Sequence, residues 1–244
     1  MKFPLLAPTD SASLVWLERH RAVAGSQRRP LSGPPTEDLL AQVLTSLPQG
    51  PTRWVVEDLW TPSILLRDLT EIPKGSEAQE AFFRWRFTQS LALEEPHFVQ
   101  ALEVEPHVWL ASGIREAFRD SLLQLGMRLD RSVVALIPRW LHLYNHLAPN
   151  LDMPGMLLSL SPVEPGRYAG TLVAWGRTVC LLRQWSEPLD PAGWAEERIA
   201  PSAAYLQRES RTPQQLFIWG APSWPDSSIS LRILDERTLF GEGR

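Results

Sequence analysis

The order of predicted elements repeats along the chain, and this repeat constrains the fold more than any other feature of the sequence. Alternating apolar runs predict strands, apolar residues at helical spacing predict helices, and Gly and Pro separate the runs. The first set of elements comprises strands at 13–18, 21–25 and 26–31, a helix from Thr36 and a strand at 53–59. A further short strand is predicted at 3–6, in FPLL.

The second set begins at Gly155 and follows the same order. It comprises the strand-like runs GMLLSLS, RYAGTLVAWG and TVCLLRQWS, a helix at 192–209 and a strand at 215–220. Pro201 is expected to kink or divide the helix. Two such units, packed together, form the duplicated lobes of actin-like and ribonuclease-H-like α/β proteins. One mixed sheet with helices on both faces is the alternative that the same elements allow.

The middle of the chain predicts a small inserted α+β subdomain. An extended run at 63–72 leads to a helix capped by Ser76, two strands follow, and a helix at 114–125 is expected to stop at Gly126. A strand ending at Pro138 and a helix at 139–147 come next. The predicted domains are 1–62 for the start of the first lobe, 63–112 for the insertion, 113–150 for the end of the first lobe and 151–244 for the second lobe.

Charge and composition exclude several classes of function. The chain of 244 residues has a formal net charge of -4, which gives no general attraction for nucleic acid. It lacks a run of about 18 apolar residues, and the amino-terminal apolar stretch is too short for a signal peptide. The single cysteine, Cys180, lies in an apolar run and is interpreted as a core residue. We therefore expect a cytoplasmic protein.

The candidate phosphate-binding turn is poor in the residues that bind phosphate. In a nucleotide-binding actin-like protein, the turn after the first strand needs glycine so that backbone N–H groups can approach phosphate. That turn is placed at 8–13, where Asp10, Ser11 and Ser13 are the candidate contacts, but it has no glycine. A polar turn capped by Asp10 explains the same residues. Neither ATP nor magnesium is expected as a cofactor.

Other catalytic chemistry has little support. Asp10, Glu57 and Asp58 are the carboxylates that a two-metal nuclease would use, although neighbouring residues of a strand point to opposite faces. His142 and His146 lie four apart on a predicted helix, without a clear third metal ligand. The GxSxG, P-loop, GxGxxG and paired CxxC patterns are absent. No catalytic residue and no metal site are predicted.

Aromatic residues indicate a binding surface. Among the 11 tryptophans, Trp60, Trp85, Trp194 and Trp224 lie in contexts that favour partial exposure, whereas those within strand-like runs are interpreted as core. The segment FFRWRF, 82–87, mixes aromatic rings with arginines, and packing of this helix on the middle sheet is the alternative explanation.

The segment from Phe82 to Asn145 resembles the PilM family of type IV pilus assembly proteins and the cytoplasmic domain of type II secretion GspL proteins. The resemblance rests on FFRWRFTQSLALEEPHFVQALEV and on HVWLASGIREAFRDSLLQLGMRLDRSVVALIPRWLHLYN. It implies an actin-like scaffold at the inner face of the inner membrane, which binds the cytoplasmic tail of a PilN-like bitopic membrane protein. It also makes an assembly ATPase a candidate partner, and it leaves contact with the membrane to the partners.

PilM-type proteins carry an aspartate and a glycine in the first phosphate turn and bind ATP, but only Asp10 matches that pattern here. The departure favours the GspL-like scaffold over an ATP-binding actin-like protein, with a ribonuclease-H-like nuclease as the third candidate. The tail is expected to bind around the inserted helix and the strand after it. The candidate partner-binding residues are Phe82, Phe83, Trp85, Phe87 and Phe98.

Overall fold

The structure, a computed structural model, divides into two compact units, Met1–Arg139 and Trp140–Arg244. It describes residues 12–24, 27–31, 35–147, 153–221, 223–225, 227 and 229–235. The predicted strand at 3–6 lies outside the described residues. The division into four segments drawn from the sequence stays a prediction.

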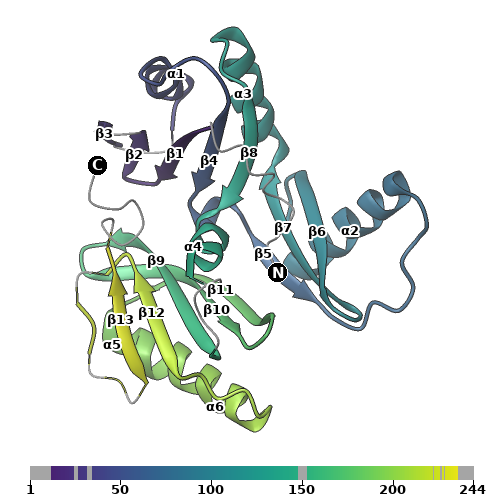
Figure 1. Cartoon of the computed structure of the whole chain (residues 1–244), viewed down its shortest axis with the longest axis vertical. Helices are drawn as coiled ribbons and strands as arrows, with labels where there is room; N and C mark the ends of the chain where they lie inside the picture. Colours follow the sequence, from purple (N-terminus) through teal and green to yellow (C-terminus); the bar gives the residue numbers. More distant parts are fainter. Residues whose placement is uncertain are drawn as a thin grey trace. The chain divides into compact units, whose positions relative to one another are not determined.

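The first unit is built on a five-stranded sheet whose order is β3-β2-β1-β4-β8 (Figure 1). Its strands are β1 (Ser13–Glu18), β2 (Arg21–Ala24), β3 (Gln27–Pro30), β4 (Thr52–Val56) and β8 (Val133–Pro138). β1, β2 and β3 pair antiparallel, whereas β1, β4 and β8 run parallel. The hairpin turn at Arg19 and His20 has the position that the sequence predicted.

Two helices share a core with this sheet. α1 (Glu37–Thr45) begins after Thr36, whose side chain accepts a hydrogen bond from the Leu39 N–H at 3.4 Å. α3 (Glu116–Arg128) contributes Leu122 and Leu125 to the core that α1 also enters. The faces of parallel strands are apolar and need to be covered, and α1 and α3 cover one face of this sheet.

Gly126 does not stop α3, contrary to the prediction, because the helix continues to Arg128. Its role is steric. A Cβ atom at Gly126 would lie 2.4 Å from the backbone oxygen of Arg131 and 3.1 Å from a methyl group of Val133. The glycine therefore lets the chain return closely against the helix before β8 begins.

The segment between β4 and α3 forms a second, three-stranded antiparallel sheet of order β5-β7-β6 with one helix. Its elements are η1 (Asp58–Trp60), β5 (Ser63–Leu66), α2 (Ser76–Leu91), β6 (His97–Glu105) and β7 (Val108–Arg115). Two hydrogen bonds bring the ends of the segment together: Gly113 N–H donates to Pro62 O at 2.9 Å, and the Ser63 and Ser112 hydroxyls lie 2.8 Å apart.

The predicted cap of α2 is wrong by one residue. Gly75 is the N-cap and Ser76 is the first helical residue, so no side chain caps the helix. Gly75 has a φ of 95°, which glycine adopts without the steric penalty that a side chain would bring.

The second unit repeats the topology of the first, with a five-stranded sheet of order β11-β10-β9-β12-β13. Its strands are β9 (Gly155–Glu164), β10 (Arg167–Trp175), β11 (Val179–Leu189), β12 (Gln215–Trp219) and β13 (Ser230–Leu234). β9, β12 and β13 run parallel, as β1, β4 and β8 do. The repeated order is therefore confirmed, the single mixed sheet is excluded, and β13 is a strand that the sequence analysis missed.

Helices cover this sheet as well. α4 (Arg139–Leu147) packs on it through Tyr144, whose ring lies 5.5 Å from that of Trp175. The predicted helix at 192–209 is divided as expected near Pro201, into α5 (Pro191–Gly193), a π-helical segment η3 (Trp194–Ile199) and α6 (Ala200–Arg208).

Trp194 is fully buried, contrary to the partial exposure that was predicted. Its indole N–H donates to Tyr168 O at 2.7 Å. Cys180 is buried in the core of the second unit, as predicted.

We predict that Gly126→Ala destabilises the protein by about 1–3 kcal/mol, although alanine favours an exposed helix by about 1 kcal/mol over glycine. The reason is the contact that the new Cβ would make with the Arg131 carbonyl. Urea unfolding measures the change, with Gln124→Ala on the exposed face of the same helix as the control. A variant as stable as the parent would refute the close contact.

Candidate functional site

Charged side chains gather at the carboxyl ends of the three parallel strands of the first unit. Glu18 ends β1, Glu57 and Asp58 follow β4, and Arg139 follows β8. In open α/β sheets this end of the strands is the usual place for a ligand. Here the chain's own side chains fill it: Glu57, Asp58 and Arg139 are each at most 2% exposed.

Arg139 is the cation of this strand-end cluster. Its guanidinium lies 3.2 Å from Glu18 Oε1 and 3.4 Å from Asp58 Oδ2. Burial would lower the pKa of Arg139, but Asp58, Glu18 and Glu57 raise it above its ordinary value. Burial would likewise raise the pKa of Glu18, but the charge of Arg139, with the hydrogen bond and charge of Arg21, holds it below its ordinary value. Glu18 and Arg139 are therefore both ionised at neutral pH.

The Glu57 carboxylate binds the backbone of the turn after β1. Its Oε2 accepts a hydrogen bond from the Arg19 N–H, and its Oε1 is buried without a hydrogen-bond partner among the described residues. An N–H group in this turn is what a phosphate would need. The turn contains Arg19 and His20, with no glycine.

Of the three predicted phosphate contacts, the structure describes only Ser13. Asp10 and Ser11 are outside the described residues, and Ser13 is the first residue of β1, at the opposite end from the turn at Arg19 and His20. The N–H of Ser13 donates to Pro51 O at 2.9 Å. The structure does not bring Ser13 to the strand-end cluster.

No group of three metal-ligating side chains occurs in the part of the chain that the structure describes. Glu57 and Asp58 are two of the carboxylates that the nuclease alternative would use, but the structure pairs Asp58 with Arg139 and Glu57 with the Arg19 backbone. On α4, His142 is half-buried and His146 is exposed.

Two of the predicted partner-binding residues form the inner face of α2. Phe83 and Phe87 are 5% and 0% exposed, in a core with the three-stranded sheet. The rings of Phe83 and Trp109 lie 4.6 Å apart. A Cβ atom at Gly113 would lie 2.6 Å from the Phe87 ring, so this position of β7 requires glycine.

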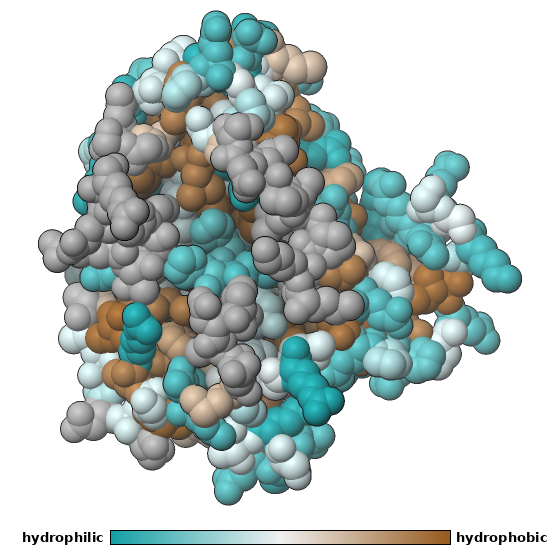
Figure 2. Space-filling view, in the orientation of Figure 1, coloured by the Kyte–Doolittle hydropathy of each residue, from teal (hydrophilic) through white to brown (hydrophobic). Residues whose placement is uncertain are grey.

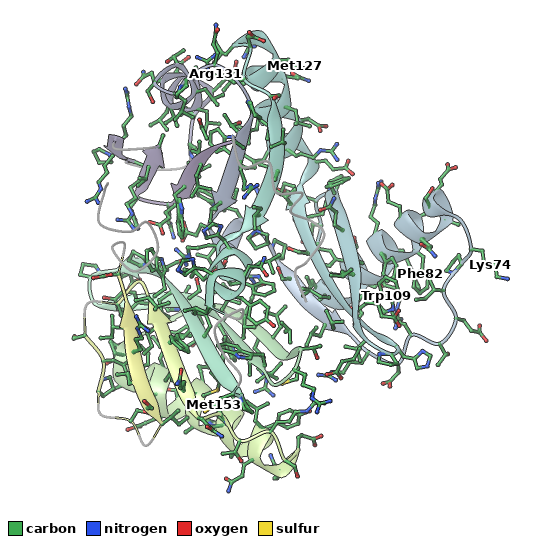
Figure 3. All side chains as sticks on the ribbon, in the orientation of Figure 1. Lys74, Phe82, Trp109, Met127, Arg131 and Met153 are labelled. Atoms are coloured by element: carbon green, nitrogen blue, oxygen red, sulfur yellow. The ribbon has the colours of Figure 1, made fainter. Side chains whose placement is uncertain are left out.

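The outer face of α2 carries the exposed aromatic side chains, in a region where Figure 2 shows hydrophobic atoms at the surface. Trp85 is 55% exposed, and its ring lies 6.3 Å from that of half-buried Phe82. The guanidinium of Arg86 lies 5.7 Å from the Trp85 ring. Phe82 lies at the edge of the exposed side of α2, where the helix meets the sheet near Trp109 (Figure 3). We call Phe82, Trp85 and Arg86 the outer face of α2.

Phe98 is not part of this face. It neighbours Val99 on β6, and Val99 packs in the core below α2. Because successive residues of a strand point to opposite faces, Phe98 lies on the other side of the sheet. There the guanidinium of Arg119, on α3, lies 4.4 Å from its ring.

Sequence reasoning missed Glu18 and Arg139. The available signal was position: each is a charged residue at the carboxyl end of a predicted strand, where ligand-binding or compensating side chains gather. Their mutual contact joins residues 121 positions apart, which no local pattern reports.

We predict that Arg139→Met destabilises the protein by about 3–5 kcal/mol at pH 7, because three buried or half-buried carboxylates lose their cation. Because the pKa of Glu18 is lowered in the folded parent, its ionisation stabilises the fold at pH values above the pKa of Glu18 in the unfolded chain. This stabilisation is lost as the pH falls through the pKa of Glu18 in the folded protein. The difference between variant and parent should thus narrow below about pH 5. Chemical denaturation at several pH values measures it.

The control is Arg128→Met, which removes an exposed ion pair with Glu37 and should cost less than about 1 kcal/mol. A loss of unfolding free energy in Arg139→Met that did not change with pH would contradict an ionised pair of Glu18 and Arg139.

No family model and no curated protein matches the chain. The cytoplasmic domain of EpsL, an inner membrane component of the type II secretion system of Vibrio cholerae, matches with a TM-score of 0.50 and 11% identity, over 91% of this chain and 88% of that one. A chain of the PilM-PilN type IV pilus biogenesis complex matches with a TM-score of 0.57 and 14% identity, over 86% of this chain and 81% of that one.

These matches cover 86% and 91% of the chain and so extend over both units. The chain therefore has the actin-like α/β fold of the GspL cytoplasmic domain and of the PilM-PilN structure, as the resemblance in its middle segment predicted.

Proposed function

We propose that the chain is a scaffold in the inner-membrane assembly platform of a type II secretion or type IV pilus system. The observation that carries this proposal is the fold match, which extends over at least 86% of the chain to proteins of those two systems. No helix in the described residues is long and apolar enough to cross a membrane. In the proposed role, the protein is cytoplasmic and reaches the inner membrane through its partners, among which an assembly ATPase is a further candidate.

The proposed partner is a PilN-like bitopic membrane protein, bound through its short cytoplasmic tail. The presence of PilN in one of the matching structures supports this choice. The outer face of α2 suits such a tail because Trp85 and Phe82 offer apolar area close to the Arg86 charge. Aromatic side chains and arginine are the residues that dominate binding energies at interfaces. Phe83 and Phe87 would support the surface from below rather than touch the tail.

We also propose that the protein works without nucleotide and is not an enzyme. The strand-end cluster supports this, since Glu18, Glu57 and Asp58 would repel a polyphosphate and the Arg19 N–H already has an acceptor. A nucleotide would have to displace a buried, hydrogen-bonded carboxylate and leave Arg139 with fewer partners, which is costly.

We predict that Trp85→Ala weakens binding of a synthetic peptide of the PilN-like tail by about 10- to 30-fold, as expected for an aromatic anchor. Isothermal titration calorimetry measures the affinity. Met127→Ala is the control, because Met127 is 74% exposed on α3, away from the outer face of α2. Unchanged affinity in both Trp85→Ala and Phe82→Ala would rule out this surface, and no binding by the parent would rule out the partner.

We predict that ATP with magnesium at millimolar concentration leaves the melting temperature of the protein unchanged. A ligand at 100 times its Kd stabilises a folded protein by about 2.7 kcal/mol, so even weak nucleotide binding would raise the melting temperature. A thermal-shift titration measures this, with sodium tripolyphosphate as the control for general anion effects. A saturable rise in melting temperature with ATP, but not with tripolyphosphate, would contradict this proposal and favour an ATP-binding protein.

A further inference from the structure

The two units differ in the helices that cover their equivalent parallel strands. In the first unit, the connection from β4 to β8 contains α3, which packs beside α1 in one core. In the second unit, the connection from β12 to β13 spans only residues 220–229, and its described residues form no helix. Parallel strands are usually joined through a helix that covers the sheet. α1 therefore has α3 beside it, whereas its counterpart α6 has no equivalent of α3 among the described residues.

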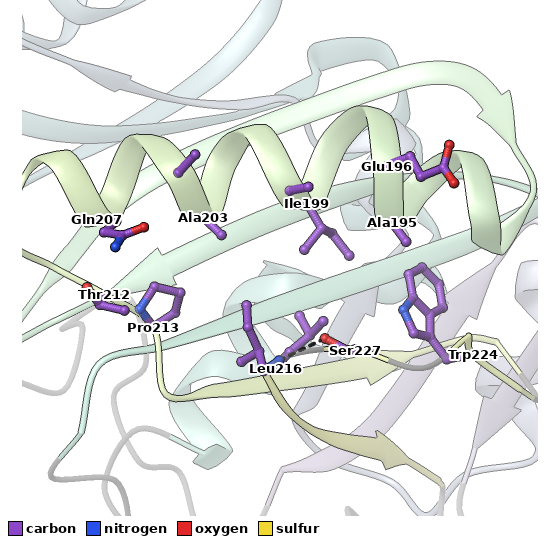
Figure 4. A pocket seen from close by; sticks show the side chains of 13 residues that line it. Ala195, Glu196, Ile199, Ala203, Gln207, Thr212, Pro213, Leu216, Trp224 and Ser227 are labelled. Atoms are coloured by element: carbon purple, nitrogen blue, oxygen red, sulfur yellow. Dashed lines mark hydrogen bonds between the residues drawn. The ribbon is translucent and has the colours of Figure 1, made fainter.

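A groove of about 520 Å³ lies along this uncovered side of η3 and α6. Figure 4 shows Ala195, Ile199 and Ala203 of the helix on one wall, with Leu216 of β12 and Trp224 of the connection opposite. Leu216 is fully buried and Ile199 is 5% exposed, so both lie deep in the groove. Most of the lining is apolar, with Glu196, Gln207, Thr212 and Ser227 as its polar residues. The small alanine side chains leave room for another backbone to approach.

The length of the groove matches a short helix. Its lining extends from Ala195 to Gln207 along the helix, which is roughly 18 Å at 1.5 Å per residue. A helix of about 12 residues has this length. The corresponding helix of the first unit, α3, has 13 residues.

Charge specifies the occupant further. Glu196 is the charged side chain among the described lining residues, and it has no ion-pair or hydrogen-bond partner in the described part of the chain. It lies in the first turn of η3. In the first unit, Glu37 in the first turn of α1 pairs with Arg128 of α3. In the second unit, Glu196 is an exposed carboxylate without such an arginine partner among the described residues.

We propose that an amphipathic helix of a partner protein, about three turns long and bearing an arginine or lysine, docks in this groove and pairs with Glu196. Its apolar face covers Ile199 and Leu216 as α3 covers the equivalent sheet in the first unit. This is helix-in-groove recognition. The site lies within the second unit and is separate from the outer face of α2, so it does not depend on binding of a membrane-protein tail.

Two stapled, fluorescein-labelled helices test the proposal on the full chain: one with the α3 sequence EAFRDSLLQLGMR, and one idealised alanine–leucine helix of equal length with an arginine in its last turn. Fluorescence anisotropy is expected to show saturable binding in the micromolar range. Glu196→Arg should weaken it about five- to tenfold, and a helix with glutamate in place of the arginine should then bind the variant better than the parent. Ala203→Trp, which fills the groove, should abolish binding.

The matched controls are Glu197→Arg and Ala192→Trp, which change exposed residues outside the groove and should leave the affinity unchanged. Circular dichroism verifies that each variant is folded, and Glu196→Arg keeps the test valid if Ala203→Trp does not fold.

Three results would overturn the proposal. The first is no saturable binding of either helix, or binding that Glu196→Arg and Ala203→Trp leave unchanged. The second is binding of the dye anilinonaphthalene sulfonate that Ala203→Trp blocks and neither helix displaces, which would assign the groove to small apolar molecules. The third is a dimer in sedimentation experiments that is lost in Ala203→Trp, which would assign it to a second copy.

Discussion

Parallel pairing at the centre of each sheet is the constraint on which the rest of the structure depends. Consecutive residues of β4 and β9 are buried, among them Trp54 to Val56 and Met156 to Leu158, so both faces of these strands are apolar. Such strands are stable only when layers cover both faces. In the first unit α1 and α3 share a core with one face of the sheet, and in the second unit η3 and α6 do so. The groove along α6 lies where the described part of the second unit has no helix equivalent to α3.

The carboxyl ends of the parallel strands impose a second constraint, because the charged side chains there are buried and need partners within the protein. Arg139 meets it in the first unit by neutralising carboxylates from the ends of β1 and β4. A buried ion pair contributes little net stability compared with apolar packing, but loss of one partner is costly. The cluster therefore fixes the ends of three strands relative to one another. For a protein proposed to act as a scaffold, constant shape is a more useful property than an accessible ligand site.

The parts of the fold that depend on local pattern were predictable from sequence, and those that depend on distant contacts were not. The hairpin at Arg19 and the order of strands and helices follow from residue alternation and turn residues. Trp194 was misjudged because its burial depends on the Tyr168 carbonyl. β13, with the sequence SLRIL, was missed because it is short and contains serine and arginine. The partial exposure predicted for Trp85 is confirmed, but the burial of Phe83 and Phe87 was missed because the apolar residues of α2 surround the helix.

The three-stranded sheet and α2 enter and leave the first unit at a single point, where Gly113 and Pro62 are hydrogen bonded and Ser63 meets Ser112. Because both ends of this segment are tied together, changes of length or side chains at its far end have little effect on the host sheet. Natural selection is thus free to remodel the inserted part for a new binding partner while the duplicated framework stays as it is. The insertion behaves as an exchangeable adaptor, and it is the part of the molecule in which we expect related proteins to diverge most.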